Sequence, residues 1–192
     1  GIYLVTPMEG EMLKEACYAC LANILVHEGY PGHHLQLSCA AKKLRPMRLL
    51  SAAVETVEGW AFYCEEAMKK LGFYSDEEGL LIQGVDALWR AVRVVVDVNL
   101  STGRMSYEEA VEFLSKETGM PKRAAEAEVK NYSLRPGYAM SYYIGKKTIK
   151  ELKELAKKVW GSDYSERRFH DLLLYEGNLP LSMFDELITA SK

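Results

Sequence analysis

The chain has 192 residues, of which 48% are hydrophobic and 27% charged, and its formal net charge is −3. This is the composition of a globular protein, and a domain of such a length buries about 70% of the surface of its unfolded chain. The lack of a basic excess argues against nucleic acid as a partner. No apolar run approaches the roughly 20 residues that span a bilayer, so we expect no membrane partner and a cytoplasmic location.

The first predicted helix runs from about Glu9 to Glu28, because apolar side chains recur there at helical spacing. It leads into the sequence HEGYPGHH at residues 27–34, which contains three of the four histidines of the chain. Neutral imidazole is the commonest protein ligand of zinc. This stretch therefore predicts a metal site.

An unbroken helix through this stretch could not build that site. His33 would lie roughly 9 Å along the axis from His27 on another face, and His34 would return to the same face only roughly 10.5 Å away. Two ligands that each lie about 2 Å from zinc cannot be so far apart. The ring of Pro31 clashes with the carbonyl of His27, and the glycine that follows adds backbone freedom. We therefore predict a kink or π-type bulge over Tyr30–Gly32 that returns His33 toward His27.

Beyond this break we predict a helix from His33 to Lys43 and another from about Met47 to Leu71. The second carries Glu55, Glu58 and Glu65, whose spacings place them near one helical face. Solvation of an amphipathic helix explains many such carboxylates. Opposite a histidine pair, however, the stripe predicts a carboxylate ligand, either Glu58 or Glu55, with Glu65 as the acceptor of a histidine N–H.

A predicted helix from about Asp76 to Leu100 carries Arg90 and Arg93 among apolar residues. Two interpretations stay open. Each arginine could form a buried ion pair with an aspartate or glutamate. Alternatively, they could clamp a substrate carboxylate, which a guanidinium group binds bidentately.

The remaining sequence predicts only helices, so the expected fold is all-α, with residues 1–192 as a single multi-helix domain. Ser106 opens one helix with a capping box, and Ser165 caps another. The expected helices extend to about Glu117, from Lys122 to about Ser133, from after Gly145 to about Trp160, and to Ile188 at the end of the chain.

The chain has four cysteines, Cys17, Cys20, Cys39 and Cys64, which could in principle form two disulfides or a metal site. Cys17 and Cys20 form a C-x-x-C without a second such pair, which is a weak indication of a metal cluster. We expect all four to be buried reduced thiols, because free cysteine behaves as a small core hydrophobe.

Two motifs carry a resemblance to known proteins. The strings HEGYPGHHLQ at residues 27–36 and VEGWAFYCE at residues 57–65 resemble those of a widespread family catalogued as a domain of unknown function. They also resemble gluzincin metallopeptidases such as thimet-type oligopeptidases and angiotensin-converting enzyme. In gluzincins a glutamate on a later helix is the third ligand. The resemblance therefore implies one Zn²⁺ per chain held by His27, His33 and Glu58, with His34 as the alternative to His33.

A third motif, PGYAMSYYIG at residues 136–145, resembles the family's P-G-Q-A-x-x-Y-x-I-G. The resemblance implies that Tyr142 donates a hydrogen bond to the oxyanion of the transition state, with His170 as a second donor. Arg135 and Tyr138 become candidate substrate-binding residues, and Tyr138 stands where the family has glutamine. Without the resemblance, such tyrosines and a lone histidine are more often core residues.

Together these assignments predict a zinc-dependent hydrolase, a metallopeptidase of carboxypeptidase or oligopeptidase type, with Glu28 as general base. The expected partner is a peptide or small amide substrate. Two alternatives stay open: a metal-dependent hydrolase of a non-peptide amide or ester, and a non-catalytic metal-binding helical protein. Family members usually carry a further helical region before the metal motif. The chain is therefore expected to be a catalytic part, a fragment, or a compact version completed by self-association as a homo-oligomer.

Overall fold

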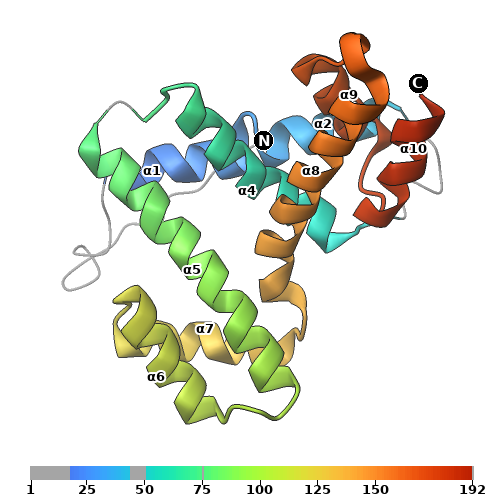
Figure 1. The fold of residues 1–192 in the computed structure, drawn as a ribbon. Helices are drawn as coiled ribbons and strands as arrows, with labels where there is room; N and C mark the ends of the chain where they lie inside the picture. Colours follow the sequence, from blue (N-terminus) through green and yellow to red (C-terminus); the bar gives the residue numbers. More distant parts are fainter. Residues whose placement is uncertain (1–17, 44–50, 75, 192) are drawn as a thin grey trace.

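The computed structural model describes residues 18–43, 51–74 and 76–191, and the regular structure within these ranges is all helical (Figure 1). The prediction of an all-α fold is confirmed. The α-helices are α1 Tyr18–Ile24, α2 His33–Lys42, α4 Val54–Lys70, α5 Glu77–Ser101, α6 Tyr107–Thr118, α7 Lys122–Leu134, α8 Tyr138–Trp160, α9 Glu166–Glu176 and α10 Phe184–Ala190. A π-helical segment, η2 Leu25–Gly29, and two 3-10 segments, η3 Gly161–Asp163 and η4 Leu181–Met183, lie between them.

Helix α4 lies at the centre of the molecule. Its residues from Glu58 to Glu65 are all buried, which is expected only of a helix with neighbours on every side. Helix α8 crosses it at Gly59 and Gly145, and a Cβ atom built on Gly145 would lie 2.0 Å from the carbonyl oxygen of Glu55. Because no side chain fits between the two backbones, the position of α8 on α4 is closely fixed.

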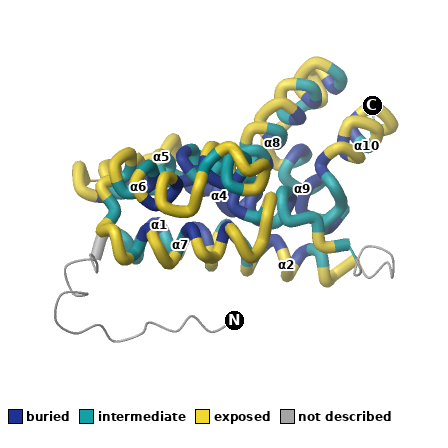
Figure 2. The backbone as a smooth tube through the Cα atoms, turned by 90° about the horizontal axis from the view of Figure 1, so that it is seen from below, coloured by how far each residue is buried: buried dark blue, intermediate teal, exposed yellow. Residues whose placement is uncertain are grey.

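The two longest helices, α5 and α8, diverge from the end of the molecule where α7 lies (Figure 1). One hydrophobic cluster lies between α4, α8, α9 and α10, and includes Trp60, Ile149 and Phe169. A second lies between α5, α6 and α7, and includes Val96 and Leu114. Figure 2 shows buried residues along α4 and on the inward sides of the surrounding helices, with exposed residues outside.

Helix α8 begins at Tyr138 and not after Gly145, so this part of the prediction is wrong. Gly137 takes a left-handed conformation with φ of 84° and starts the helix. The buried carboxylate of Asp97 on α5 accepts hydrogen bonds from the backbone N–H groups of Gly137 and Met140, at 2.9 and 3.0 Å. This carboxylate satisfies amides of the first turn that would otherwise lack partners.

Helix α4 begins at Val54, later than the predicted Met47. Residues 44–50 lie outside the described ranges, and residues 51–53 are not helical. Residues 51–53 instead form hydrogen bonds with the loop before η4. Ser51 Oγ and the Ala53 N–H both donate to the carbonyl oxygen of Asn178, at 2.7 and 3.2 Å. A contact 127 residues away in sequence sets this boundary.

None of the helices in the described ranges is long and apolar enough to span a membrane. Cys39 and Cys64 are free and buried, as predicted. Cys20 is in a disulfide, so the prediction of a reduced thiol is wrong for this residue. Cys17 lies outside the described ranges, as does the part of the first predicted helix that precedes Tyr18.

Candidate metal centre

The segment between α1 and α2 folds back on itself. The π-helical turn is at Leu25–Gly29, earlier than the predicted Tyr30–Gly32, and the Tyr30–Pro31 peptide bond is cis. At Gly32 the chain passes so close to its own backbone that a Cβ atom would lie 1.8 Å from the carbonyl oxygen of His27. The absence of a side chain at Gly32 therefore lets the chain return, and α2 begins with His33 beside His27.

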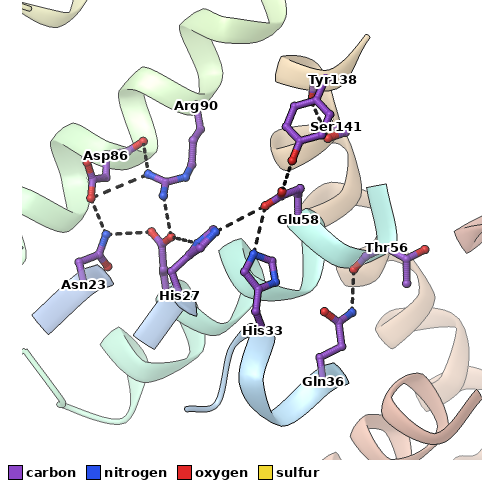
Figure 3. Close-up of polar contacts among 11 residues, drawn as sticks. Asn23, His27, His33, Gln36, Thr56, Glu58, Asp86, Arg90, Tyr138 and Ser141 are labelled. Atoms are coloured by element: carbon purple, nitrogen blue, oxygen red, sulfur yellow. Dashed lines mark hydrogen bonds and ion pairs between the residues drawn. The ribbon is translucent and has the colours of Figure 1, made fainter. Parts of the chain in front are cut away.

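Three side chains from η2, α2 and α4 converge at this point (Figure 3). Oε2 of Glu58 lies 3.5 Å from Nε2 of His27 and 3.3 Å from Nε2 of His33. The two imidazole rings meet edge to face with centroids 4.8 Å apart. The three candidate ligand atoms all lie within 4.8 Å of one another, and His27 and Glu58 are buried.

This arrangement fits a zinc ion. Two ligands at about 2.0–2.1 Å from zinc in tetrahedral geometry are about 3.3–3.4 Å apart, close to the separations between Glu58 and the two histidines. Oε2 of Glu58 is buried and has no hydrogen-bond partner. A buried carboxylate oxygen without a hydrogen bond is costly, and a bound cation would remove that cost. Two imidazoles and one carboxylate are also a donor set that zinc accepts in catalytic sites.

A second carboxylate orients His27 from behind. Oε1 of Glu65 lies 2.7 Å from Nδ1 of His27, which leaves Nε2 to face Glu58. Glu65 is fully buried and also receives Arg90 Nη2 at 3.0 Å and Asn23 Nδ2 at 3.1 Å. A carboxylate on the far nitrogen of a ligating histidine fixes its ring and tautomer, and the sequence predicts this contact for Glu65.

The protonation of the centre reflects its buried charges. Burial raises the pKa of Glu58, but the imidazoles of His27 and His33 and the hydroxyl of Tyr138 outweigh burial and hold that pKa well below its usual range. Burial lowers the pKa of His27, but the carboxylates of Glu58 and Glu65 outweigh it and raise the pKa above its ordinary value. Glu58 is therefore an anion at neutral pH that attracts a cation.

Two tyrosines of α8 border the centre. Tyr138 donates a 2.6 Å hydrogen bond to Oε1 of Glu58, a role that the sequence does not predict (Figure 3). The ring of Tyr142 lies nearly parallel to that of His27, with centroids 6.1 Å apart. Burial and the nearby Glu58 raise the pKa of Tyr142, so its phenol keeps its proton and remains a hydrogen-bond donor.

The candidate arginines have different surroundings. Arg90 is buried and forms an ion pair with Glu65, as the ion-pair interpretation predicts, and it also donates to the backbone oxygen of Asp86 at 3.1 Å. Arg93 lies over the rings of Trp89 and Tyr142. Arg135 is exposed and lies 5.7 Å from the centroid of Tyr138.

Three other candidate residues, Glu28, His34 and Glu55, are not part of the cluster of ligand atoms. Glu28 is exposed, and its carboxylate makes no hydrogen bond or ion pair with the described residues. His34 is also exposed, so the structure brings His33 and not His34 to Glu58. Glu55 is half-buried on α4, and it is not part of the cluster of candidate ligand atoms.

His170 lies in a different place. It accepts or donates a 2.9 Å hydrogen bond with the Tyr63 hydroxyl and packs against Trp60, with centroids 5.5 Å apart. Together with Pro31 and Leu35 these residues line a cavity of about 740 Å³ between α2, α4 and α9. Among the described residues no contact joins His170 to His27, His33 or Glu58.

The structure adds polar residues that sequence reasoning missed. Asn23 is buried, donates to Glu65 and Asp86, and receives the Tyr74 hydroxyl at 2.6 Å. Two spacings could have indicated this network: Asn23 lies four residues before His27, and Asp86 four before Arg90, each on one face of its helix. No local pattern pairs Tyr74 with either helix.

An all-helical fold with a His-His-Glu cluster, of which His27 and Glu58 are buried and His33 half-buried, places the chain in a class of helical proteins with a candidate metal centre. The chain belongs to the family described as "Bacterial protein of unknown function (DUF885)", which matches residues 1–188. The expected relation to a domain of unknown function is thereby confirmed. No curated protein matches the chain.

Two solved structures share this fold. The first, described as the putative lipoprotein from Colwellia psychrerythraea, is 32% identical, with a TM-score of 0.85 over 91% of this chain and 30% of that chain. The second, described as a putative lipoprotein of unknown function from Shewanella oneidensis, is 26% identical, with a TM-score of 0.85 over 97% of this chain and 36% of that chain. The chain spans about a third of the length of these two proteins.

Proposed function

We propose that this chain carries the metal centre of a zinc-dependent hydrolase, and specifically of a gluzincin-like metallopeptidase. One observation supports the proposal above others: Oε2 of Glu58 is buried without a hydrogen bond and faces Nε2 of both His27 and His33. His27, His33 and Glu58 would hold the ion. When bound, zinc lowers the pKa of a coordinated water to about 7 and polarises a carbonyl oxygen.

The residues around the centre have the chemistry that hydrolysis of an amide requires. Glu28 follows His27 directly and is exposed, and its carboxylate has no partner among the described residues, so it can take a proton from water and pass it to the leaving amine. Tyr142 keeps its phenolic proton and lies against His27, where it can donate to the oxyanion. His170 has no place in this proposal, because its contacts are with Tyr63 and Trp60.

The order of the motifs also supports the proposal. The H-E pair at residues 27–28 precedes a glutamate of α4, as in gluzincins, and Glu65 supports a histidine from behind. The solved relatives are about three times as long as this chain. The activity of a protein of that full length is therefore also only proposed.

Metal content tests the site directly. We expect about one zinc per purified chain by elemental analysis, and loss of most of it in Glu58→Gln and His33→Ala. The chain offers matched controls: Glu55→Gln on the same helix and His34→Ala on the next residue, both of which should keep the metal. Loss in His34→Ala but not in His33→Ala would contradict the assigned ligands. A reconstituted wild type without metal would contradict the whole site.

Cleavage tests the reaction. We expect a peptide library to be cleaved by the zinc-loaded wild type and not by Glu28→Gln, which should keep its zinc because Glu28 is not a ligand. Cleavage of simple esters or amides without any cleavage of peptides would keep the metal chemistry and change the substrate class. Full activity of Glu28→Gln would overturn the role of Glu28.

A further inference from the structure

A cavity of about 270 Å³ adjoins the candidate metal centre and has no part in holding the metal. Its walls come from α5, α7 and α8. Tyr138 and Tyr142 form the wall on the side of the centre, because Tyr138 bonds to Glu58 and Tyr142 lies against His27. A ligand in this cavity would therefore lie one tyrosine ring away from the proposed zinc ligands.

Arg93 is held in this cavity by stacking. Its guanidinium carbon lies 4.0 Å from the ring centroid of Trp89 and 4.9 Å from that of Tyr142, and Nε donates to the Tyr132 hydroxyl at 3.1 Å. Nη2 lies 3.6 Å from Glu128, whereas Nη1 has no hydrogen-bond partner among the described residues. A guanidinium held in this way has already lost most of its rotamer freedom, so binding an anion costs it little more.

Arg135 supplies a second positive charge to the same cavity. It is exposed at the end of α7, and its side chain forms no ion pair with any described residue. Among the described residues that line the cavity, only Glu128 is acidic, and its carboxylate already contacts Arg93 and accepts from the Tyr132 hydroxyl at 2.9 Å. Two guanidinium groups face one carboxylate, which leaves one positive charge unbalanced.

Arg90 provides a contrast within the same helix. Its guanidinium is buried and paired with the fully buried Glu65, so it does not reach the cavity. Its role is structural. The arginine clamp that the sequence offers as one alternative is thus absent at Arg90. The arrangement that could bind a carboxylate joins Arg93 of α5 with Arg135 after α7.

We propose that this cavity binds a carboxylate of the substrate through Arg93 and Arg135, which makes the enzyme selective for peptides with a negative group near the cleaved bond. The inference rests on the proposed function of the adjoining centre. An extended peptide advances roughly 3.3–3.6 Å per residue, and a tyrosine ring separates the cavity from the centre, so the carboxylate would lie within a few residues of the cleaved bond. It can come from the C-terminus of the peptide or from an Asp or Glu side chain.

Binding to Glu28→Gln with zinc present tests this selectivity, because the peptide is not cleaved in that background. The probes are N-acetyl-trialanine as free acid, the same peptide as C-terminal amide, and an amidated peptide with glutamate as its last residue. We expect the free acid to bind at least tenfold more tightly than the amide by calorimetry. If the glutamate peptide alone regains the affinity, the cavity reads a side chain and not a C-terminus. Equal affinity for all three would overturn the proposal.

Variants assign the effect to the cavity. We expect Arg135→Ala to weaken binding of the acid at least tenfold without changing binding of the amide. Arg123→Ala on the exposed side of α7 is the matched control and should change neither. Glu128→Gln should strengthen binding of the acid several-fold, because it removes the competing carboxylate. Arg135 is exposed, so its removal leaves the fold intact, and unchanged binding in Arg135→Ala would overturn the assignment.

A second readout separates this inference from the proposed function. Trp89 stacks on Arg93, so binding of the acid should change its fluorescence, and a Trp89→Phe variant should lose that change. The titration is repeated on metal-free protein. Arginine-dependent binding in a protein that takes up no zinc would refute the proposed enzyme and keep the anion site. Cleavage of the acid and amide peptides at equal rates would support the proposed enzyme and refute the anion site.

Discussion

The two carboxylate oxygens of Glu58 have different surroundings. Oε1 accepts the Tyr138 hydrogen bond, whereas Oε2 faces both histidines and has no hydrogen bond. The bond to Oε1 fixes the rotation of the carboxylate, so that Oε2 is held in place before any cation arrives. Tyr138 therefore positions the carboxylate through one oxygen and leaves the other oxygen to face the cation.

Tyr138→Phe should therefore weaken zinc binding by roughly 10-fold to 100-fold, since outer partners of metal ligands have effects of this size. A competition titration against a zinc chelator measures the affinity. The matched control is Tyr143→Phe, five residues further along α8, where the side chain is exposed and does not contact Glu58. Equal affinities for wild type and Tyr138→Phe would show that the hydrogen bond does not position the carboxylate.

The ion pair of Arg90 and Glu65 is fully buried, so its loss should be costly. Arg90→Met leaves a buried carboxylate whose remaining donors among the described residues are His27 and Asn23, and should lower the free energy of unfolding by about 3 kcal/mol. Urea denaturation measures the change. Arg167→Met removes an exposed pair with Asp171 and should cost less than about 0.5 kcal/mol. Comparable losses in the two variants would contradict the structural role of Arg90.

Sequence reasoning could name the candidate ligands because histidine is rare in this chain and its motif is local. The same reasoning could not reach Tyr138, which bonds to a carboxylate 80 residues away. The resemblance implies His170 as a second donor, and in the structure its hydrogen-bond partner is Tyr63. In both cases tertiary contact decides the role, and residue type alone does not.

Among the helices, the crossing of α4 and α8 is most sensitive to a single methyl group. A Cβ atom on Gly145 would overlap the backbone of Glu55, and one on Gly59 would lie 2.6 Å from backbone atoms of Gly145. Gly145→Ala should lower the free energy of unfolding by about 1–3 kcal/mol or more, as overpacking does. It should also weaken zinc binding, because the two helices carry Glu58 and Tyr138.

Thermal and metal titrations of the same variant check both effects. Gly84→Ala is the matched control: this glycine lies within α5, and a Cβ atom there meets nothing within 4 Å. Alanine is the better helix former, so Gly84→Ala should raise the free energy of unfolding by about 0.5–1 kcal/mol and leave zinc binding unchanged. A neutral Gly145→Ala would contradict the backbone contact.

Charges across the same two helices predict a dependence on pH. Glu66 of α4 lies 2.9–3.2 Å from Lys70, Lys146 and Lys150. Burial raises its pKa, but these ammonium groups outweigh burial and lower it to about 2. Because the folded pKa lies below the unfolded value, the stabilisation is present above about pH 4.5 and is lost as the pH falls toward 2.

Glu66→Gln should consequently lower the free energy of unfolding by about 1–2 kcal/mol at pH 7, after allowance for solvent screening of a partly exposed group. The difference between wild type and variant should shrink steadily below pH 4.5. Urea denaturation at pH 7, 4.5 and 3 measures it. A difference that does not vary with pH would attribute the loss to packing and not to charge.

At the scale of elements the sequence predicts most helices well and their distortions less well. The capping box at Ser106 and the cap at Ser165 are local signals, and both helices begin where predicted. The start of α8 depends on Asp97, 40 residues earlier than Gly137, so no local signal predicts it. The π-helical turn lies at Leu25–Gly29, before Pro31, although the proline is the sequence signal for the break.

For the whole molecule, the candidate metal centre lies where the two hydrophobic clusters meet. Val26, which precedes His27, and Trp60, two residues after Glu58, belong to one cluster, and Ala139, next to Tyr138, belongs to the other. A bound ion would therefore stabilise the junction between them. At a free zinc concentration about 100 times the Kd, the free energy of unfolding should rise by about 2.7 kcal/mol.

This corresponds to an increase in Tm of roughly 5–10 °C for a chain of this size, which calorimetry with zinc and with chelator would measure. Glu58→Gln should show almost no increase under the same conditions, while Glu55→Gln should respond like the wild type. An increase of the same size in Glu58→Gln would assign the stabilisation to a different site.

The glycine contact between α4 and α8 has a consequence for movement. Sliding one helix along the other would bring neighbouring side chains into a gap that accommodates only backbone, so the two helices should move as one rigid body. Glu58 of α4 and the two tyrosines of α8 would then keep their relative positions while a substrate of the proposed hydrolase enters. Any opening and closing must come from the segments that face this body: the turn that bears the histidines, or α5 and α7 with their arginines.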